Sequence, residues 1–354
     1  MRPGGPAAIP FKNKRMPESM PDAIISVQNL TKTFTNRKRA SGLGGSIKSL
    51  FFAQKEEIAA VDNINFEVQK GELVGYLGPN GAGKSTTIKM LTGILRPTSG
   101  RILVGGIDPV KDRRGVSRQI GVVFGQKTQL WWDLPVGESF DLLRLIYKIP
   151  QDVYKKRMEF FSDLLGIGDF VNQQTRKLSL GQRMRSDLAA SLLHNPPILF
   201  LDEPTIGLDI LTRDTVREFI RNLNRTEKTT ILLTTHDIQD IEFLAQRLIL
   251  LDKGKTGYDG NIGDFIKSYA PLRILTVHLE TPLKAEWLQK QGYAIASSQS
   301  ERHYDIRLEE NQNMGSLIES LTKNGNRIEE IQIRNQDLGE TLKLLYRGKK
   351  GLEL

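Results

Sequence analysis

Cysteine is absent from this chain of 354 residues, which excludes disulfide bonds, a thiol nucleophile and metal sites built on thiolates. Long apolar runs are absent as well, and no stretch approaches the roughly 20 apolar residues that a membrane-spanning helix needs. The first residues, with Pro3, Pro6 and Pro10, lack the apolar block of a secretory signal. We therefore expect the protein to lie on the cytosolic side and to reach a membrane only through a partner protein.

Acidic residues are fewer than basic ones, with 41 Asp and Glu against 50 Lys and Arg, so the formal net charge is +9. This surplus suits an anionic partner, which could be nucleic acid, a lipid headgroup surface or a nucleotide, and charge alone does not choose among them. A hydrophobic share of 39% and a charged share of 26% are typical of a globular protein with a sizeable core. The length has room for one large domain and a small one.

The stretch from Gly78 to Thr86, GPNGAGKST, matches the phosphate-binding loop G-x-x-x-x-G-K-[ST] at every fixed position. A short apolar strand, LVGYL, precedes it and a helical pattern begins at Lys84, which is the order that this loop requires. Lys84 is predicted to reach the β- and γ-phosphates, and the Ser85 hydroxyl to bind Mg²⁺. The residues of the loop that are predicted to bind a nucleoside triphosphate are Gly78, Pro79, Asn80, Gly81, Ala82, Gly83, Lys84, Ser85 and Thr86.

Residues 1–21 are rich in Pro and Gly, and we expect a disordered extension there. Strands are expected at 23–34 and 59–68, on either side of a basic insertion at 36–57. Within the insertion, apolar residues recur at roughly helical spacing beside basic ones, at Leu43, Ile47, Leu50 and Phe51. Two interpretations are open: an amphipathic segment that lies against lipid headgroups or a membrane partner, or a solvated hairpin loop whose apolar side packs on its own domain.

A further buried strand from Ile120 is expected to end at Gln126, where a glutamine suits contact with Mg²⁺ or the attacking water. A helical subdomain is then predicted at about 127–190. Near its start Trp131 and Trp132 are adjacent, and neighbours on a helix or strand cannot both face inward. One indole is expected to be exposed and to anchor an interface, and the alternative is that both rings pack within the helical insert.

Two later segments carry polar residues at element ends. A loop opening a helix places Ser179, Gly181 and Gln182 where N–H groups and a hydroxyl could bind an anion. The apolar strand 198–201 delivers two adjacent carboxylates, Asp202 and Glu203, whose burial without a cation would be costly. Asp202 is predicted to bind Mg²⁺ through water and Glu203 to polarise the attacking water. His236, at the end of the strand from Thr229, is a further catalytic candidate.

These motifs together resemble the nucleotide-binding subunit of an ATP-binding cassette (ABC) transporter, over about residues 24–268. The resemblance implies an ATPase with catalytic Lys84, Gln126, Glu203 and His236, with Ser85, Gln126 and Asp202 at Mg²⁺, and with Phe34 as the adenine platform. One position departs from the family's LSGGQ signature, because Leu180 replaces the first glycine. Ser179 and Gly181 remain, so this change bears on packing at the site more than on activity.

The part after residue 270 predicts strands and helices in the order βαββαβ followed by a helix, which fits a small ferredoxin-like α+β domain at 271–354. It holds no clustered metal ligands and no glycine-rich loop, so we assign it no catalysis. The fold class expected for the whole chain is α/β: a P-loop ABC ATPase domain at 22–270, with a mixed β core and a helical subdomain, followed by this domain.

The resemblance further implies a dimer of two ABC subunits, expected to be a homodimer, in which Ser179 and Gly181 of one copy cover the ATP of the other. Hydrolysis would then drive a separate multi-span permease, of the six-span exporter kind, from the cytoplasmic face of the membrane. The alternative is a soluble ABC ATPase acting on nucleic acid or the ribosome. Such relatives typically carry two cassettes in one chain or a long coiled-coil insertion, whereas this sequence has one cassette and no sustained heptads. No nucleic acid is therefore expected as a partner. An inactive scaffold would have lost Lys84, Glu203 or His236, and all three are present.

Overall fold

The computed structural model describes residues 23–37, 55–125, 127–269, 273–308, 312–335 and 337–347. The described chain forms two compact units that divide between Asn261 and Ile262. The sequence places this boundary later, after residue 270. Helix α9 (Ile262–Tyr269) packs against the last helix, α12 (Leu338–Arg347), and for this reason it groups with the second unit.

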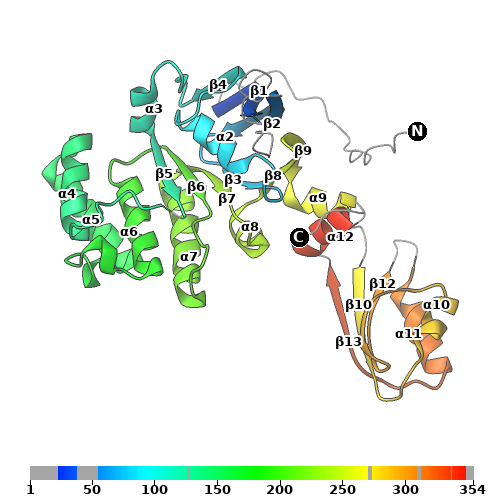
Figure 1. Cartoon of the computed structure of the whole chain (residues 1–354). Coiled ribbons are helices and arrows are strands. Elements are labelled where there is room, and N and C mark those ends of the chain that lie inside the picture. The colour runs from blue at the N-terminus through cyan, green and yellow to red at the C-terminus, as the bar shows by residue number, and fades with distance from the viewer. Residues whose placement is uncertain are drawn as a thin grey trace, which may run out of the picture. The chain divides into compact units, whose positions relative to one another are not determined.

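The first unit is built on a six-stranded sheet in which the phosphate loop follows a central strand (Figure 1). All neighbouring pairs are parallel except the last, which is antiparallel. The central strands are apolar and buried along almost their whole length, as parallel strands covered on both faces require. In sheet order the strands are β5 (Ile120–Phe124), β6 (Ile198–Asp202), β7 (Thr230–Thr234), β3 (Leu73–Leu77), β8 (Arg247–Asp252) and β9 (Lys255–Asn261).

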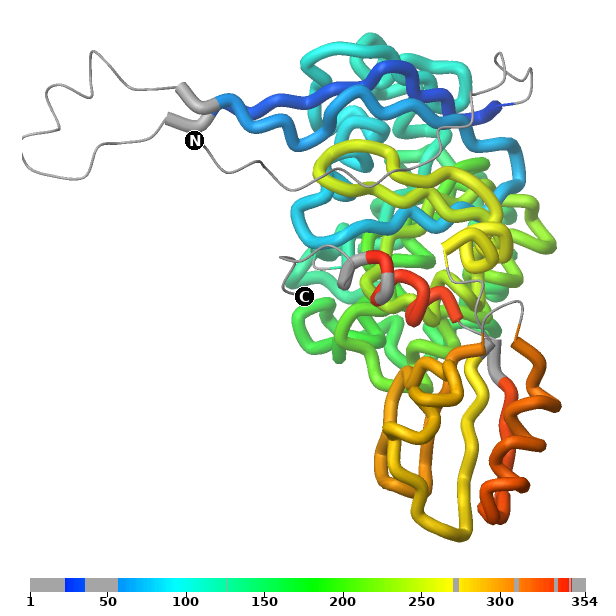
Figure 2. Tube along the Cα trace, turned by 90° about the vertical axis from the view of Figure 1, so that its right-hand side faces the viewer, coloured from blue at the N-terminus to red at the C-terminus, as the bar shows by residue number. Residues whose placement is uncertain are grey.

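A second sheet in this unit is antiparallel, with the order β2 (Lys55–Gln69), β1 (Ala23–Arg37) and β4 (Ser99–Val104). Strands β1 and β2, in blue in Figure 2, run side by side and pair as far as Arg37 and Lys55. Both strands are longer than predicted, so the ends of the expected insertion 36–57 are strand. Its central residues, including Leu43, Ile47, Leu50 and Phe51, lie outside the described residues, as does the extension 1–21.

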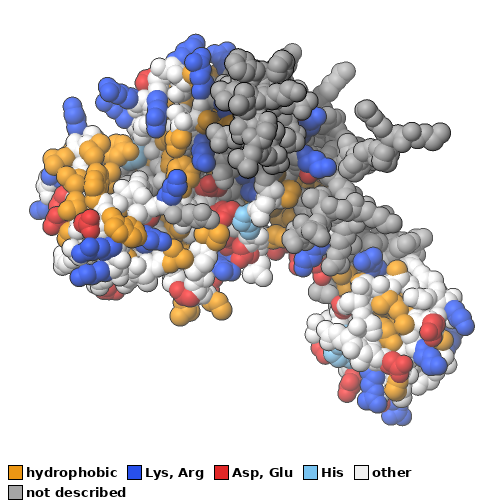
Figure 3. All heavy atoms as spheres, in the orientation of Figure 1, with side chains coloured by type: hydrophobic (Ala, Val, Ile, Leu, Met, Phe, Trp, Pro, Cys, Tyr) orange, Lys and Arg blue, Asp and Glu red, His pale blue; other side chains and the backbone are white. Residues whose placement is uncertain are grey.

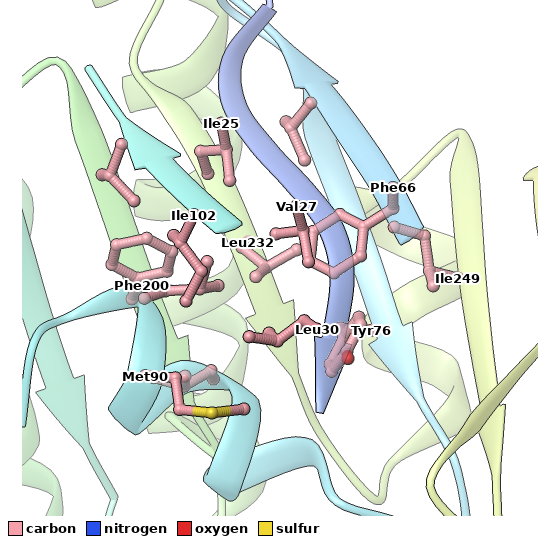
Figure 4. Close-up of a cluster of buried hydrophobic side chains, with 14 of the residues drawn as sticks. Ile25, Val27, Leu30, Phe66, Tyr76, Met90, Ile102, Phe200, Leu232 and Ile249 are labelled. Atoms are coloured by element: carbon pink, nitrogen blue, oxygen red, sulfur yellow. The ribbon is translucent and has the colours of Figure 1, made fainter. Parts of the chain in front are cut away.

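The main hydrophobic core lies between these two sheets and holds helix α2 (Lys84–Leu91) (Figure 4). Val27 and Phe66 come from the antiparallel sheet, Phe200 and Leu232 from the six-stranded sheet, and Met90 from α2. Because α2 begins at the phosphate loop, its buried side fixes the position of that loop relative to both sheets.

A helical segment follows β5 and consists of α4 (Val136–Tyr147), α5 (Gln151–Leu165) and α6 (Leu180–Leu192), with two short 3₁₀ turns, Ile167–Asp169 and Thr175–Lys177, between α5 and α6. Helix α6 packs against both α4 and α5. The other helices of this unit are α3 (Arg113–Gln119), α7 (Ile210–Glu227) and α8 (Ile238–Leu244). Among the described ranges, no helix has the length and apolar character needed to cross a bilayer.

The second unit contains a four-stranded antiparallel sheet in the order β11-β12-β10-β13. Helices α10 (Ala285–Lys290) and α11 (Met314–Lys323) contribute Leu288, Leu317 and Leu321 to its core. The strands are β10 (Arg273–Leu279), β11 (Ala294–Ser300), β12 (His303–Leu308) and β13 (Ile328–Asn335). This βαββαβ order with antiparallel neighbours confirms the ferredoxin-like topology expected from the sequence.

Candidate active site

The phosphate loop joins β3 to α2 through a glycine that no other residue could replace without strain. Gly83, immediately before α2, has φ 104°, in the left-handed region. A Cβ on Gly83 would also lie 2.4 Å from the Ala60 carbonyl oxygen of β2. The loop is therefore held tightly against β2, with the N-terminus of α2 directed at the place where phosphates would bind.

Lys84 is buried in this loop and its ammonium group is held by backbone oxygens. Lys84 Nζ donates to Gly78 O at 2.6 Å and to Pro79 O at 3.1 Å. Desolvation lowers the pKa of Lys84, while the nearby Glu203 and Asp202 carboxylates act to raise it. The cation is thus positioned over the loop and is partly relieved of its water, so phosphate oxygens could replace the two carbonyls.

Ser85 and Asp202 bring their side-chain oxygens together at the end of β6. Ser85 Oγ donates to Asp202 Oδ1 at 3.3 Å, and Thr234 Oγ1 at the end of β7 donates to the same oxygen at 2.5 Å. These contacts join the end of β6 to α2 and to the end of β7. The sequence predicts Ser85 and Asp202 as neighbours at a metal ion, and the structure places them in contact.

Gln126 lies outside the described residues. The strand expected to end at Gln126 ends at Phe124, because the next residue bends toward β6: Gly125 N donates to Asp202 O at 2.8 Å. A Cβ on Gly125 would lie 2.2 Å from the Glu203 carbonyl oxygen. The chain just before Gln126 is therefore packed against the acidic end of β6.

Glu203 and His236 form a close pair. His236 Nε2 lies 2.5 Å from Glu203 Oε1, and the Glu203 side chain is more buried than that of His236. Glu203 has φ 58°, a conformation that non-glycine residues adopt rarely, and its N–H donates to Thr234 O at 2.9 Å. A carboxylate directed in this way can accept a proton from water, and an adjacent imidazole can hold it in orientation.

Ser179 is exposed and caps α6. Its Oγ accepts from Gln182 N at 3.2 Å, while Gln182 Oε1 accepts from Ser179 N at 3.0 Å, a capping box that leaves the hydroxyl at the open end of the helix. A Cβ on Gly181 would lie 2.7 Å from Thr212 Cγ2, so this glycine allows α6 to approach α7. The contacts of Ser179 and Gly181 are thus with their own helix and with α7.

Leu180, the departure from the family signature, lies beside the loop that follows Glu203. Its Cδ2 would be 2.9 Å from a Cβ on Gly207, which has φ 70°. This leucine therefore packs on the 204–209 loop, in line with the expectation that the substitution bears on packing.

Phe34 stands opposite Ile58 in the β1–β2 ladder, and both side chains are exposed. Two residues further along β2, the Ala60 carbonyl lies against Gly83 of the phosphate loop. Lys32 Nζ is 5.2 Å from the centre of the Phe34 ring. The register thus brings an exposed aromatic ring to the strand pair that borders the phosphate loop.

The Trp pair is more exposed than predicted. Trp131 and Trp132 are 40% and 51% exposed, so the alternative in which both rings pack within the helical insert is wrong. The reason is local: residues 131–134 form a turn before α4, so both rings project from a loop.

Comparison with known proteins identifies the family. Residues 61–206 match the family model described as ABC transporter. NatA of Bacillus subtilis, an ABC transporter ATP-binding protein, is 35% identical over 218 residues, which cover 62% of this chain and 88% of NatA.

The chain belongs to the ABC transporter ATP-binding proteins.

Similarity extends beyond the cassette in at least one case. An uncharacterized ABC transporter ATP-binding protein of Nostoc sp. strain PCC 7120 is 30% identical over 300 residues, covering 81% of this ABC subunit and 87% of the relative. Among solved structures, a dimer of the ATP-binding cassette MJ0796 in a post-hydrolysis state, bound to ADP and Pi, matches with a TM-score of 0.56 and 28% identity, covering 67% of this chain and 98% of that one. This ABC subunit is accordingly an ATPase.

Two groups of residues in the ABC subunit escaped the sequence analysis. Thr234 holds both Asp202, through its hydroxyl, and Glu203, through its carbonyl. The fully buried Asp240 accepts from Thr205 of the loop after Glu203, from Thr235 beside His236, and from Arg217 Nε of α7 at 2.5 Å. The only signal was the pair Thr234-Thr235 directly before His236, because hydroxyls at a strand end often bind neighbouring carboxylates.

Proposed function

We propose that this ABC subunit binds ATP with Mg²⁺, hydrolyses ATP between two copies of the chain, and drives a separate multi-span permease in the direction of export. The observation that carries the proposal is the Glu203–His236 pair at 2.5 Å, beside the Ser85–Asp202 contact above the phosphate loop. A general base, an orienting group and oxygen ligands thus meet where a γ-phosphate would lie.

Ser85 and Asp202 fit Mg²⁺ because their hydroxyl and carboxylate oxygens are only 3.3 Å apart and are of the hard type that this ion prefers. Among the described residues, no three His, Cys, Asp or Glu side chains gather as a metal site. A sparse protein ligand set suits Mg²⁺, which keeps waters and takes phosphate oxygens as ligands. When bound, the ion would neutralise phosphate charge; Gln126 remains a proposed further ligand.

In the proposed reaction, Lys84 exchanges its two backbone carbonyl partners for oxygens of the β- and γ-phosphates. A water oxygen attacks the γ-phosphorus, the bond to the ADP oxygen breaks, and Glu203 accepts the proton of the water. His236 keeps the Glu203 carboxylate turned toward this water. Phe34 would stack on the adenine.

The dimer is proposed from the open end of α6. The exposed Ser179 hydroxyl, with Gly181 and Gln182, can meet the γ-phosphate of ATP bound by the phosphate loop of a second copy. The dimeric MJ0796 cassette supports this arrangement. ATP would then join the two subunits, and loss of the γ-phosphate would separate them.

The permease is proposed to dock at the helical subdomain from the cytoplasmic face of the membrane. Trp131 and Trp132 are both exposed there, and large aromatic rings are common anchors of interfaces. Figure 3 shows further hydrophobic side chains over α4, where Leu145 and Ile146 are 60% and 62% exposed. Export by a six-span permease is proposed from the resemblance to exporter cassettes. Action on nucleic acid is not favoured, because the named relatives are transporter proteins.

Purification from membranes tests this function. A tagged chain extracted in mild detergent should bring down one multi-span membrane protein in comparable amount, identified by mass spectrometry. Reconstituted together, the two should move a substrate only with ATP, and Lys84→Ala should bind the permease without transport. Recovery of ribosomal protein or nucleic acid in place of a membrane protein would contradict the proposal.

A further inference from the structure

The segment directly after Gln126 is fastened to α6 by a single buried carboxylate. Asp187 of α6 is only 5% exposed. Its Oδ1 accepts from Thr128 Oγ1 at 2.8 Å and from Gln129 N at 3.0 Å. The Asp187 backbone oxygen accepts from Gln129 Nε2 at 2.9 Å. Residues 128 and 129 therefore bind both the side chain and the backbone of one helical residue, and removal of the carboxylate would leave Thr128 Oγ1 and Gln129 N unpaired.

The exposed tryptophans come two and three residues after Gln129, and Trp132 contacts the same helix one turn earlier. The Arg183 guanidinium lies 5.8 Å from the centre of the Trp132 ring, and Arg183 precedes Asp187 by one helical turn. Trp132 O also accepts from Arg176 N at 3.0 Å, in the 3₁₀ turn that leads to Ser179. The loop with both indoles thus touches α6 and its N-terminal approach at several points.

Helix α6 transmits such contacts because it begins at Ser179. At a rise of 1.5 Å per residue, Asp187 lies about 12 Å along the helix from Ser179. Helix α6 is packed against α4 and α5, and close packing of this kind opposes bending of the helix. A shift of the Ser179 end therefore reaches Asp187, and through the clamp reaches residues 128–132.

We propose that Asp187 is a positioning residue that couples the Trp131–Trp132 surface to Ser179, so that a contact at either place changes the other. The inference rests on the proposed function, since it takes Ser179 to meet the ATP of a second copy. Asp187 acts through α6, by its contacts with Thr128 and Gln129. Arg183, on the same helix, is the charged group that acts on the Asp187 carboxylate.

Tryptophan fluorescence can report this coupling because the chain has three tryptophans, and the third, Trp287, lies in the second unit. In a Trp287→Phe, Glu203→Gln background only Trp131 and Trp132 contribute tryptophan emission. Addition of ATP and Mg²⁺ should shift its emission as the dimer forms. Asp187→Ala should reduce this response at least fivefold while the affinity for a fluorescent ATP analogue, measured in the monomer, stays within about twofold.

Asp187→Asn is the matched control. Thr128 Oγ1 and Gln129 N both donate to Asp187 Oδ1, and the single amide oxygen of asparagine can replace that atom. The fluorescence response of Asp187→Asn should therefore be retained. Thr128→Val removes one of the two donors and should give an intermediate fluorescence response. If Asp187→Ala does not fold, the response of Thr128→Val tests the inference in its place. An undiminished response in Asp187→Ala and Thr128→Val overturns the inference. The inference is also overturned if the background chain dimerises with ATP but the emission of Trp131 and Trp132 does not change. In that case the proposed function still stands. A background that stays monomeric with ATP contradicts the proposed function itself and the inference with it.

Discussion

His236 Nε2 lies 2.5 Å from Glu203 Oε1, which joins the end of β6 to the loop after β7. The two strands are parallel neighbours, so their carboxyl ends meet at one edge of the sheet. Thr234, the last residue of β7, completes the arrangement by accepting the Glu203 N–H and donating to Asp202. The direction of both carboxylates is therefore set by the adjacent strand.

The first prediction concerns Thr234→Val, which keeps the shape of the side chain and removes the hydroxyl that donates to Asp202 Oδ1. A hydrogen bond to a charged group contributes about 1.5–3 kcal/mol, so the turnover rate should fall by about tenfold or more. The Mg²⁺ concentration for half-maximal ATPase should rise, because Asp202 is less well placed. Equal Mg²⁺ titrations for Thr234→Val and the parent chain would show that Asp202 needs no such support.

The second prediction concerns mixed dimers of Lys84→Ala and Ser179→Ala. In the proposed dimer, Lys84 serves the nucleotide of its own subunit and Ser179 that of its neighbour, so both lesions would fall on one site of a mixed dimer and the other site would be intact. Some ATPase activity should return when two inactive variants are mixed. If no mixing ratio restores activity while the mixed dimers are shown to form, independent sites completed in trans are ruled out.

The third prediction concerns Trp131→Ala and Trp132→Ala. Since both rings are largely exposed, their removal should leave the melting temperature and basal ATPase of the isolated subunit nearly unchanged. Copurification with the permease and transport should be lost. A buried tryptophan would instead cost about 3–5 kcal/mol of stability. Early melting of both variants would contradict a docking role.

The fourth prediction follows from the burial of Asp187, which raises the pKa of its carboxyl from 3.8 to about 6 against the lowering effects of Gln129, Thr128 and Arg183. Between these values the folded state binds more protons than the unfolded state, so this group makes the free energy of unfolding fall as pH rises from about 4 to about 6. The Asp187→Asn variant has no titrating carboxyl at this position and therefore lacks this pH dependence of the free energy of unfolding. Its stability relative to the parent chain should therefore increase by up to about 3 kcal/mol from pH 4 to pH 7, measured by urea unfolding; a pH-independent difference would contradict it.

Much of the site could be predicted because its residues belong to short motifs that follow apolar strands. The phosphate loop, Asp202 and Glu203 each come at the end of such a strand, and parallel neighbours bring those ends together. The order of elements in the second unit was equally readable, because alternating and helical patterns are local.

Contacts between distant residues were not predictable in this way. Asp187 resembles any polar residue of a helix until the fold brings it to Gln129, 58 residues earlier in the chain. Asp240 is likewise recognisable only by its partners on three other segments. The sequence places the boundary between the units after residue 270, whereas the compact units divide before α9, because α9 packs against α12, which is far away in the chain.

The most direct measurement is size-exclusion chromatography of Glu203→Gln with ATP and Mg²⁺. The amide keeps the shape of the carboxylate but accepts a proton poorly, so turnover should nearly cease while ATP stays bound between two copies. The apparent mass should double with ATP and stay that of a monomer with ADP, and Lys84→Ala in the same background should remain monomeric. A Glu203→Gln chain that binds ATP yet stays monomeric, both alone and with its copurified permease, would contradict hydrolysis at a shared interface.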